Sequence, residues 1–149
     1  MTETAKECGC SVSTVKRCKR MKLEQQSLWD VLDMMHCKFS YHVKLAVSQI
    51  SRELKRMLGE RLVRVVLYGS YARGTYHDNS DVDIMVLVNM SEDEIRRIKN
   101  SIYDLAFEIE MNTGIDIAPI IKEKQQYEYW VDTLPFYKNI KEEGVVISE

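Results

Sequence analysis

The stretch YGSYARGTYHDNSDVDIMVLV, residues 68–88, decides the fold prediction. A polar interval that opens with a Gly-Ser pair separates two runs rich in β-branched residues, 61–68 and 81–88, and the second run begins with Asp-Val-Asp. Runs of this composition that are bounded by turn residues are typical of strands. We therefore predict two strands of one sheet, the inner one covered on both faces because its run becomes continuously apolar.

Helical patterns flank the two strands. Residues 41–60 place apolar side chains at three- and four-residue steps and reach Gly59, a common helix terminator. Residues 91–114 open on Ser91 with Glu94 three positions later, the spacing of a capping box. The side chains expected in the core are Val43, Ala46, Val47, Ile50, Leu54 and Met57 of the first helix, and Ile95, Ile98, Ile102, Leu105 and Ile109 of the second.

The remaining segments complete a small domain. Residues 114–121, GIDIAPII, predict a third strand, and residues 125–149 predict a short helix broken near Pro135 and then a last turn or strand. This alternation indicates an α/β (α+β) fold with a small mixed β-sheet flanked by helices. We assign residues 41–149 to this domain. Residues 1–40 do not continue the alternation of helix and strand patterns, and we assign them to a helical N-terminal segment.

Composition limits the classes of protein. A chain of 149 residues that is 45% hydrophobic and 30% charged fits one compact domain with a small appendage. The net charge of -2 gives no global attraction to nucleic acid or anionic membranes. The sequence shows neither a signal peptide nor a long apolar span, so we expect a cytoplasmic protein without membrane contact. The cysteines expected to be reduced thiols are Cys8, Cys10, Cys18 and Cys37.

Two aspartates at the second strand suggest a metal site. Asp81 and Asp83 are two positions apart, so on a strand their carboxylates share a face and repel each other unless a cation lies between them. Solvated carboxylates at a sheet edge are the alternative. Mg²⁺ is commonly held by one or two carboxylates together with substrate phosphates, so a phosphate site is expected nearby.

The Gly-Ser pair fits such a phosphate site. Gly69 lets the backbone approach an anion, Ser70 offers a hydroxyl and an N–H, and Arg73 adds a charged donor. Each feature alone also fits an ordinary turn. If the strand of Asp116 pairs with residues 81–88, a third carboxylate joins the cluster, where two ions can activate a nucleophile and stabilise a leaving pyrophosphate. A solvated carboxylate is again the alternative.

The order Gly69-Ser70, ten positions, and then Asp81-Val82-Asp83 resembles the G-S-x10-D-x-D signature of minimal nucleotidyltransferases (MNT) in the polymerase-β superfamily. The resemblance covers roughly residues 42–149 and implies a polymerase-β-like nucleotidyltransferase fold with ATP as the donor substrate and two Mg²⁺ ions. The residues it assigns to the nucleotide are Gly69, Ser70, Arg73 and Ser80, and those it assigns to the metal ions are Asp81, Asp83 and Asp116. It also implies that Asp116 helps to deprotonate the acceptor hydroxyl.

The resemblance also implies a biological role. Small enzymes of this family resemble MntA-like antitoxins, whose known members transfer AMP from ATP to a tyrosine of an all-helical HEPN-domain ribonuclease toxin. This implies the antitoxin of a type VII-like toxin–antitoxin module. About 27 residues follow the third strand, which is short for a drug-binding domain, so a partner protein is expected to complete the acceptor site. An aminoglycoside-like small acceptor and a non-catalytic antitoxin that binds DNA or its partner remain the alternatives.

Residues 4–20 carry a second resemblance. Ala5, Gly9 and Val15 have the spacing of the second and third helices of a bacterial helix-turn-helix, and a plain helical hairpin is the alternative. The side chains that would meet operator DNA phosphates are Arg17, Lys19 and Arg20. This segment predicts binding to the module's own operator.

Overall fold

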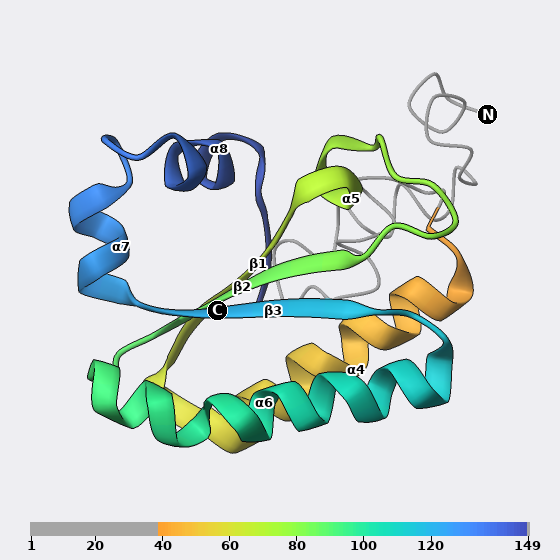
Figure 1. Ribbon diagram of the computed structural model, residues 1–149, viewed down its shortest axis with the longest axis horizontal. Helices are drawn as coiled ribbons and strands as arrows, with labels where there is room; N and C mark the ends of the chain where they lie inside the picture. Colours follow the sequence, from red (N-terminus) through yellow and green to blue (C-terminus); the bar gives the residue numbers. More distant parts are fainter. Residues whose placement is uncertain (1–38, 149) are drawn as a thin grey trace, which may run out of the picture.

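The computed structural model describes residues 39–148 as one sheet with helices on both faces (Figure 1). The four cysteines, the helix-turn-helix resemblance of residues 4–20 and nearly all of the N-terminal segment at residues 1–40 lie outside the described residues. Within the described part, no helix combines the length and hydropathy that crossing a bilayer requires.

The sheet has four strands in the order β3-β2-β1-β4. Their bounds are Leu62–Tyr68 for β1, Val82–Val88 for β2, Ile117–Glu123 for β3 and Val145–Ser148 for β4. β1 pairs antiparallel with both β2 and β4, whereas β2 and β3 are parallel. The predicted mixed sheet is therefore confirmed. β1 and β2 are both inner strands, and β2 is the more fully buried of the two, with all but one of its residues buried.

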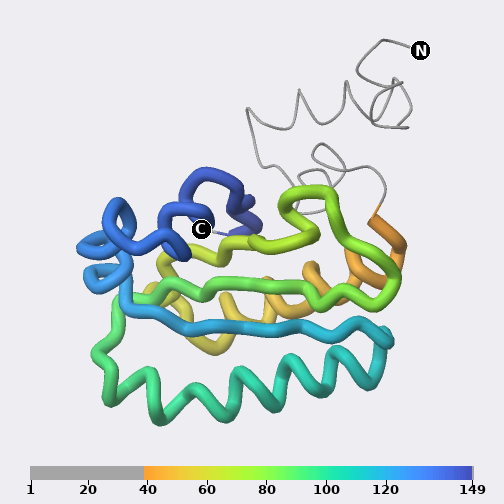
Figure 2. The backbone as a smooth tube through the Cα atoms, turned by 45° about the horizontal axis from the view of Figure 1, so that its top comes forward, coloured from red at the N-terminus to blue at the C-terminus, as the bar shows by residue number. Residues whose placement is uncertain are grey.

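Two long helices pack side by side and cover one face of the sheet; both lie below it in Figure 1, and Figure 2 shows one below the strands and the other behind them. They are α4 (Tyr41–Leu58), followed by the short 3₁₀ turn η1 (Gly59–Arg61), and α6 (Glu92–Thr113). The expectation that Met57 joins the core is wrong, because its side chain is 39% exposed and Leu58 is buried instead. Both lie near one helical turn beyond Leu54, and the sheet faces the Leu58 side.

Shorter helices cover part of the opposite face. They are α5 (Gly69–Arg73), α7 (Lys124–Trp130) and α8 (Pro135–Glu143). Pro135 occupies the first turn of α8, where its missing N–H costs nothing, so the predicted break at this residue is confirmed. This face has its own apolar cluster of Val66, Met85, Leu87, Val131, Tyr137 and Ile140. The cluster fixes α8 above β1 and β2.

The capping box of α6 forms as predicted. The Ser91 hydroxyl accepts from the Glu94 N–H at 3.4 Å, and the Glu94 carboxylate accepts from the Ser91 N–H at 2.9 Å. We expect Ser91→Ala to lower the free energy of unfolding by about 1 kcal/mol, because the N-cap acceptor is lost. Urea denaturation measures this change. Ser101→Ala, at an exposed position within the same helix, is the control and should be neutral; an equal loss in both variants would contradict the capping role.

Candidate active site

The Gly-Ser turn lies directly against a carboxylate of the neighbouring strand. β1 ends at Tyr68, and Gly69 opens α5 with a φ of 75°, in the region that favours glycine. A β-carbon added at Gly69 would collide with Oδ2 of Asp83 and lie 3.2 Å from its Cγ. The backbone expected to hold a phosphate and a carboxylate expected to hold a metal ion are therefore in contact.

The strand register brings the three predicted aspartates to one edge of the sheet. β2 and β3 run parallel with Val82 beside Ile117, and the Val82 N–H donates to the Asp116 carbonyl at 2.9 Å. Asp81 and Asp116 each precede this pair by one residue, so they lie side by side, and Asp83 shares their face two residues along. The predicted pairing of the Asp116 strand with the Asp-Val-Asp strand is confirmed.

The environment of Asp83 opposes its negative charge. Burial raises the pKa of its carboxyl above the ordinary value, and the charges of Asp81 and Asp116 raise it further, whereas Arg73 lowers it. Asp81 and Asp116 are exposed, and Asp83 is partly buried. A cation at this edge would relieve the repulsion among the three carboxylates.

The donor set fits Mg²⁺ only as part of a larger ligand shell. Among residues 39–148, no three His, Cys, Asp or Glu side chains are close enough to enclose an ion by themselves. Carboxylate oxygens are hard ligands, and Mg²⁺ usually takes one or two of them while keeping water and substrate phosphates. Asp81 and Asp83 fit that pattern, and shared coordination by Asp116 stays a prediction.

Arg73 and Ser80 have protein partners at the edge of the site. An Nη1 atom of Arg73 lies 3.4 Å from Oε2 of Glu143, at the end of α8. The Ser80 hydroxyl accepts from the His77 N–H at 2.9 Å, and the Ser80 N–H donates to the His77 carbonyl at the same distance. Ser80 therefore shapes the loop before β2, and its contact with a nucleotide stays a prediction.

Two aromatic residues next to the carboxylates were not predicted as part of the site. Tyr68 pairs with Asp83 across β1 and β2, and burial together with the Asp83 charge raises the pKa of Tyr68 to about 12. Phe136 of α8 meets the Tyr68 ring edge-on, with ring centroids 5.7 Å apart. The sequence carries no signal for this contact because the two residues are far apart along the chain.

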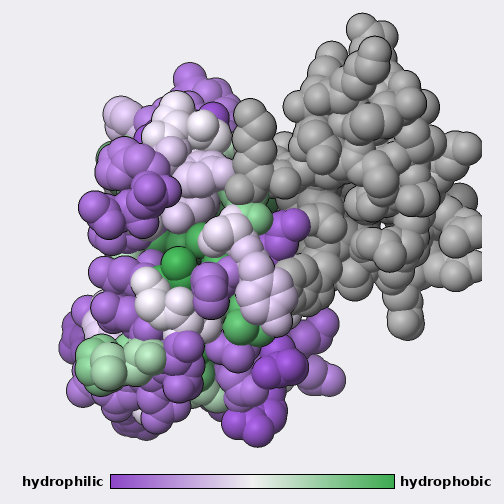
Figure 3. All heavy atoms as spheres, turned by 90° about the vertical axis from the view of Figure 1, so that its right-hand side faces the viewer, coloured by the Kyte–Doolittle hydropathy of each residue, from purple (hydrophilic) through white to green (hydrophobic). Residues whose placement is uncertain are grey.

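The surface around the site is mostly polar. The end of the molecule at which β2 and β3 begin faces the viewer in Figure 3, where hydrophilic residues surround a smaller apolar area. Tyr71 of α5 and Tyr76 of the loop that follows it stack with their ring centroids 4.3 Å apart, and Phe39 packs edge-on against both rings. These contacts hold the loop against the domain, with Tyr71 buried and Tyr76 half-buried.

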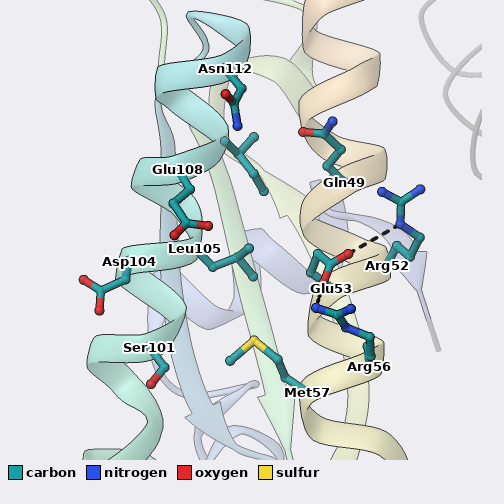
Figure 4. Close-up of a pocket in the computed structure, with 11 residues that line it drawn as sticks. Gln49, Arg52, Glu53, Arg56, Met57, Ser101, Asp104, Leu105, Glu108 and Asn112 are labelled. Atoms are coloured by element: carbon teal, nitrogen blue, oxygen red, sulfur yellow. Dashed lines mark ion pairs between the residues drawn. The ribbon is translucent and has the colours of Figure 1, made fainter.

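A groove of about 520 Å³ lies elsewhere, between α4 and α6 (Figure 4). Glu53 pairs there with Arg56 at 2.6 Å and with Arg52 at 3.6 Å, so its charged side chains largely neutralise one another. The two helices cover one face of the sheet, and Asp83 shares the other face with Met85 and Leu87 of the second apolar cluster. The groove is therefore not part of the candidate active site.

Comparison with known proteins identifies the family of the chain. A family model described as a nucleotidyltransferase domain matches residues 47–148, and the chain belongs to this family. Its fold is the α/β nucleotidyltransferase fold that the sequence predicts.

Similar proteins include two from Methanocaldococcus jannaschii, each named "Putative protein adenylyltransferase". One is 33% identical over 91 residues, which cover 61% of this chain and 90% of the relative. The other is 28% identical over 102 residues, which cover 68% and 94%.

Two solved structures also resemble the chain, each with a TM-score of 0.44. One is described as a toxin–antitoxin with AMP-PNP. It is 24% identical to this chain, and the matched region covers 66% of this chain and 70% of the chain in that structure. The other is described as a mutant of the toxin–antitoxin MntA-HpeT; it is 21% identical and covers 73% of each chain.

Proposed function

We propose that this protein is a Mg²⁺-dependent adenylyltransferase that transfers AMP from ATP to a hydroxyl group of a partner protein. The observation that carries the proposal is the contact between the Gly69 backbone and Asp83, at the edge where Asp81 and Asp116 also lie. If this turn binds phosphate and these carboxylates bind Mg²⁺, the contact would bring the two together, as transfer of a nucleotidyl group requires. Membership of the nucleotidyltransferase family supports the reaction class, and the names of the two archaeal relatives support a protein acceptor.

The proposed acceptor is a tyrosine of a HEPN-domain toxin, and the transfer would make the chain an antitoxin. The sequence resemblance to MntA-like antitoxins supports this finer assignment.

The residues divide the chemistry among them. The backbone at Gly69 and Ser70, with the Arg73 guanidinium, would hold the β- and γ-phosphates. Asp81 and Asp83 would hold Mg²⁺, which supplies charge neutralisation at the triphosphate. The acceptor oxygen would bond to the α-phosphorus as the bond to the pyrophosphate oxygen breaks. Asp116 would take the proton of the acceptor hydroxyl.

Mass spectrometry of the candidate partner tests this proposal. After incubation of the protein with the product of the neighbouring gene, ATP and Mg²⁺, we expect the partner to gain the mass of AMP on a tyrosine and to lose ribonuclease activity. Gain of phosphate alone, or AMP transfer to an aminoglycoside with none to the partner, would contradict the protein-adenylyltransferase assignment. Silencing of the partner without any modification would instead favour an antitoxin that acts by binding.

A further inference from the structure

An exposed aromatic ring lies near the carboxylate site, with one side chain, that of Tyr68, between them. Phe136 lies in the first turn of α8, and its side chain is 48% exposed. Its ring is perpendicular to that of Tyr68, with ring centroids 5.7 Å apart. The ring of the buried Tyr137 is also adjacent, with a distance of 5.6 Å between centroids. Two neighbouring rings therefore fix the orientation of Phe136, and about half of its surface remains available to a ligand.

Tyr68 connects this ring to the catalytic edge. It is the last residue of β1 and pairs with Asp83 of β2, so the two side chains lie on the same face of the sheet. The next residue is Gly69, where the phosphate-binding turn begins. Asp83, Tyr68 and Phe136 thus follow one another from the carboxylates to the surface of α8.

The α8 helix is also joined to the phosphate-binding turn. Glu143 at its C-terminus pairs with Arg73 of α5 at 3.4 Å, and α8 packs against both α5 and β1. A nucleotide held by this turn would therefore have α8 beside it.

The sheet order separates the two substrates. Asp116 lies before β3, on one side of β2, and Tyr68 and α8 lie on the β1 side. In an in-line displacement, the acceptor and the leaving pyrophosphate occupy opposite sides of the α-phosphorus. With the acceptor on the Asp116 side, the β1 side is left to the nucleotide. Phe136, which contacts Tyr68 at the end of β1, lies on this donor side.

We propose that Phe136, supported by Tyr68, forms the surface on which the base of the donor nucleotide stacks. This inference rests on the proposed nucleotidyltransferase function and adds a base-binding residue to it. Every nucleobase has a π-face that stacks on an aromatic ring, and a Phe side chain provides that face without hydrogen bonds. Phe136 is therefore expected to supply affinity for the nucleoside and little discrimination among bases.

Binding of two ligands to the full-length chain tests the assignment. Calorimetry would compare Mg·ATP with Mg·tripolyphosphate, which has the phosphates but no nucleoside. We expect Phe136→Ala to weaken ATP binding about tenfold, equivalent to about 1.4 kcal/mol, and to leave tripolyphosphate binding unchanged. Phe136→Trp should keep the affinity for ATP, since it keeps an aromatic face. In transfer assays, Phe136→Ala should raise the KM for ATP with kcat little changed.

Leu134→Ala is the matched control. Leu134 is 40% exposed, lies just before the same helix and is not part of the ring contact with Tyr68. It should leave binding of both ligands unchanged. Unchanged ATP affinity in Phe136→Ala would overturn the stacking assignment. Equal weakening of both ligands in that variant would also overturn it and would indicate a structural role for the ring. If the wild-type protein binds neither ligand, the proposed function itself fails.

Discussion

Asp83→Asn is expected to lower nucleotidyl transfer by at least about 1,000-fold without lowering the stability of the protein. Loss of a metal-binding carboxylate removes several kcal/mol of charge stabilisation in the transition state, and each 1.4 kcal/mol corresponds to about a tenfold change in rate. The side chain is only partly buried, and asparagine has nearly the same shape, so the fold should persist. Initial rates of AMP transfer and thermal melting of the same samples measure the two effects.

The pH dependence of stability gives this prediction a second readout. Burial and the Asp81 charge raise the pKa of Asp83 above 3.8, so the folded state binds this proton more tightly than the unfolded state. Ionisation of Asp83 therefore destabilises the fold above the raised pKa, and this penalty disappears as the pH falls toward 3.8. Without Mg²⁺, Asp83→Asn should be more stable than the wild type at neutral pH, and the difference should shrink on acidification.

Asp104→Asn provides the control for the Asp83 variant. Asp104 is an exposed carboxylate on α6 (Figure 4), and this helix covers the face of the sheet that does not carry Asp83. It should leave both transfer and the pH profile unchanged. Near-wild-type transfer by Asp83→Asn would contradict the metal-binding role. A large drop in its melting temperature at neutral pH would instead show that the carboxylate stabilises the fold.

Gly69→Ala is expected to lower transfer by at least about 100-fold, mainly through displacement of Asp83. The new β-carbon would collide with Oδ2 of Asp83 and lie within 3.4 Å of its Cβ. The carboxylate can rotate away at little cost in stability, but this movement takes it from the metal and phosphate, and small displacements of catalytic groups cost about 100-fold. The positive φ adds a backbone cost of about 1–2 kcal/mol.

Gly59→Ala separates these two causes. Gly59 also has a positive φ, 55°, and an added β-carbon there would meet no atom within 4 Å. This variant should lose stability in urea denaturation and keep its transfer rate at temperatures where it is folded. If the two glycine variants lose activity in parallel with stability, the contact between Gly69 and Asp83 has no specific role in the reaction.

The local features of the fold were predictable from the sequence. The helices at residues 41–58 and 92–113 have clear apolar periods and recognisable ends, and the strands have β-branched runs. The spacing between Gly69-Ser70 and Asp81-Val82-Asp83 indicated the family, and the chemistry of Mg²⁺ placed the expected phosphate site near the aspartates. These signals are readable because each depends on residues close together in the chain.

Contacts between distant segments could not be predicted in the same way. The Arg73–Glu143 pair joins residues 70 positions apart, and Phe136 reaches Tyr68 only because the second apolar cluster holds α8 above β1. Met57 and Leu58 have equivalent helical patterns, and only the position of the sheet determines which is buried. In each case, tertiary packing decides the contact, and the pattern of neighbouring residues in the sequence does not encode it.

Transfer of label from α-labelled ATP to the partner protein tests the central claim most directly. The comparison uses the wild type and the Asp81→Asn/Asp83→Asn variant, with Mg²⁺ and the product of the neighbouring gene. We predict label on the partner with the wild type and none with the double variant. Equal labelling by both proteins, or no labelling by the wild type with any of the four nucleotides while it still binds and silences the partner, would contradict the account.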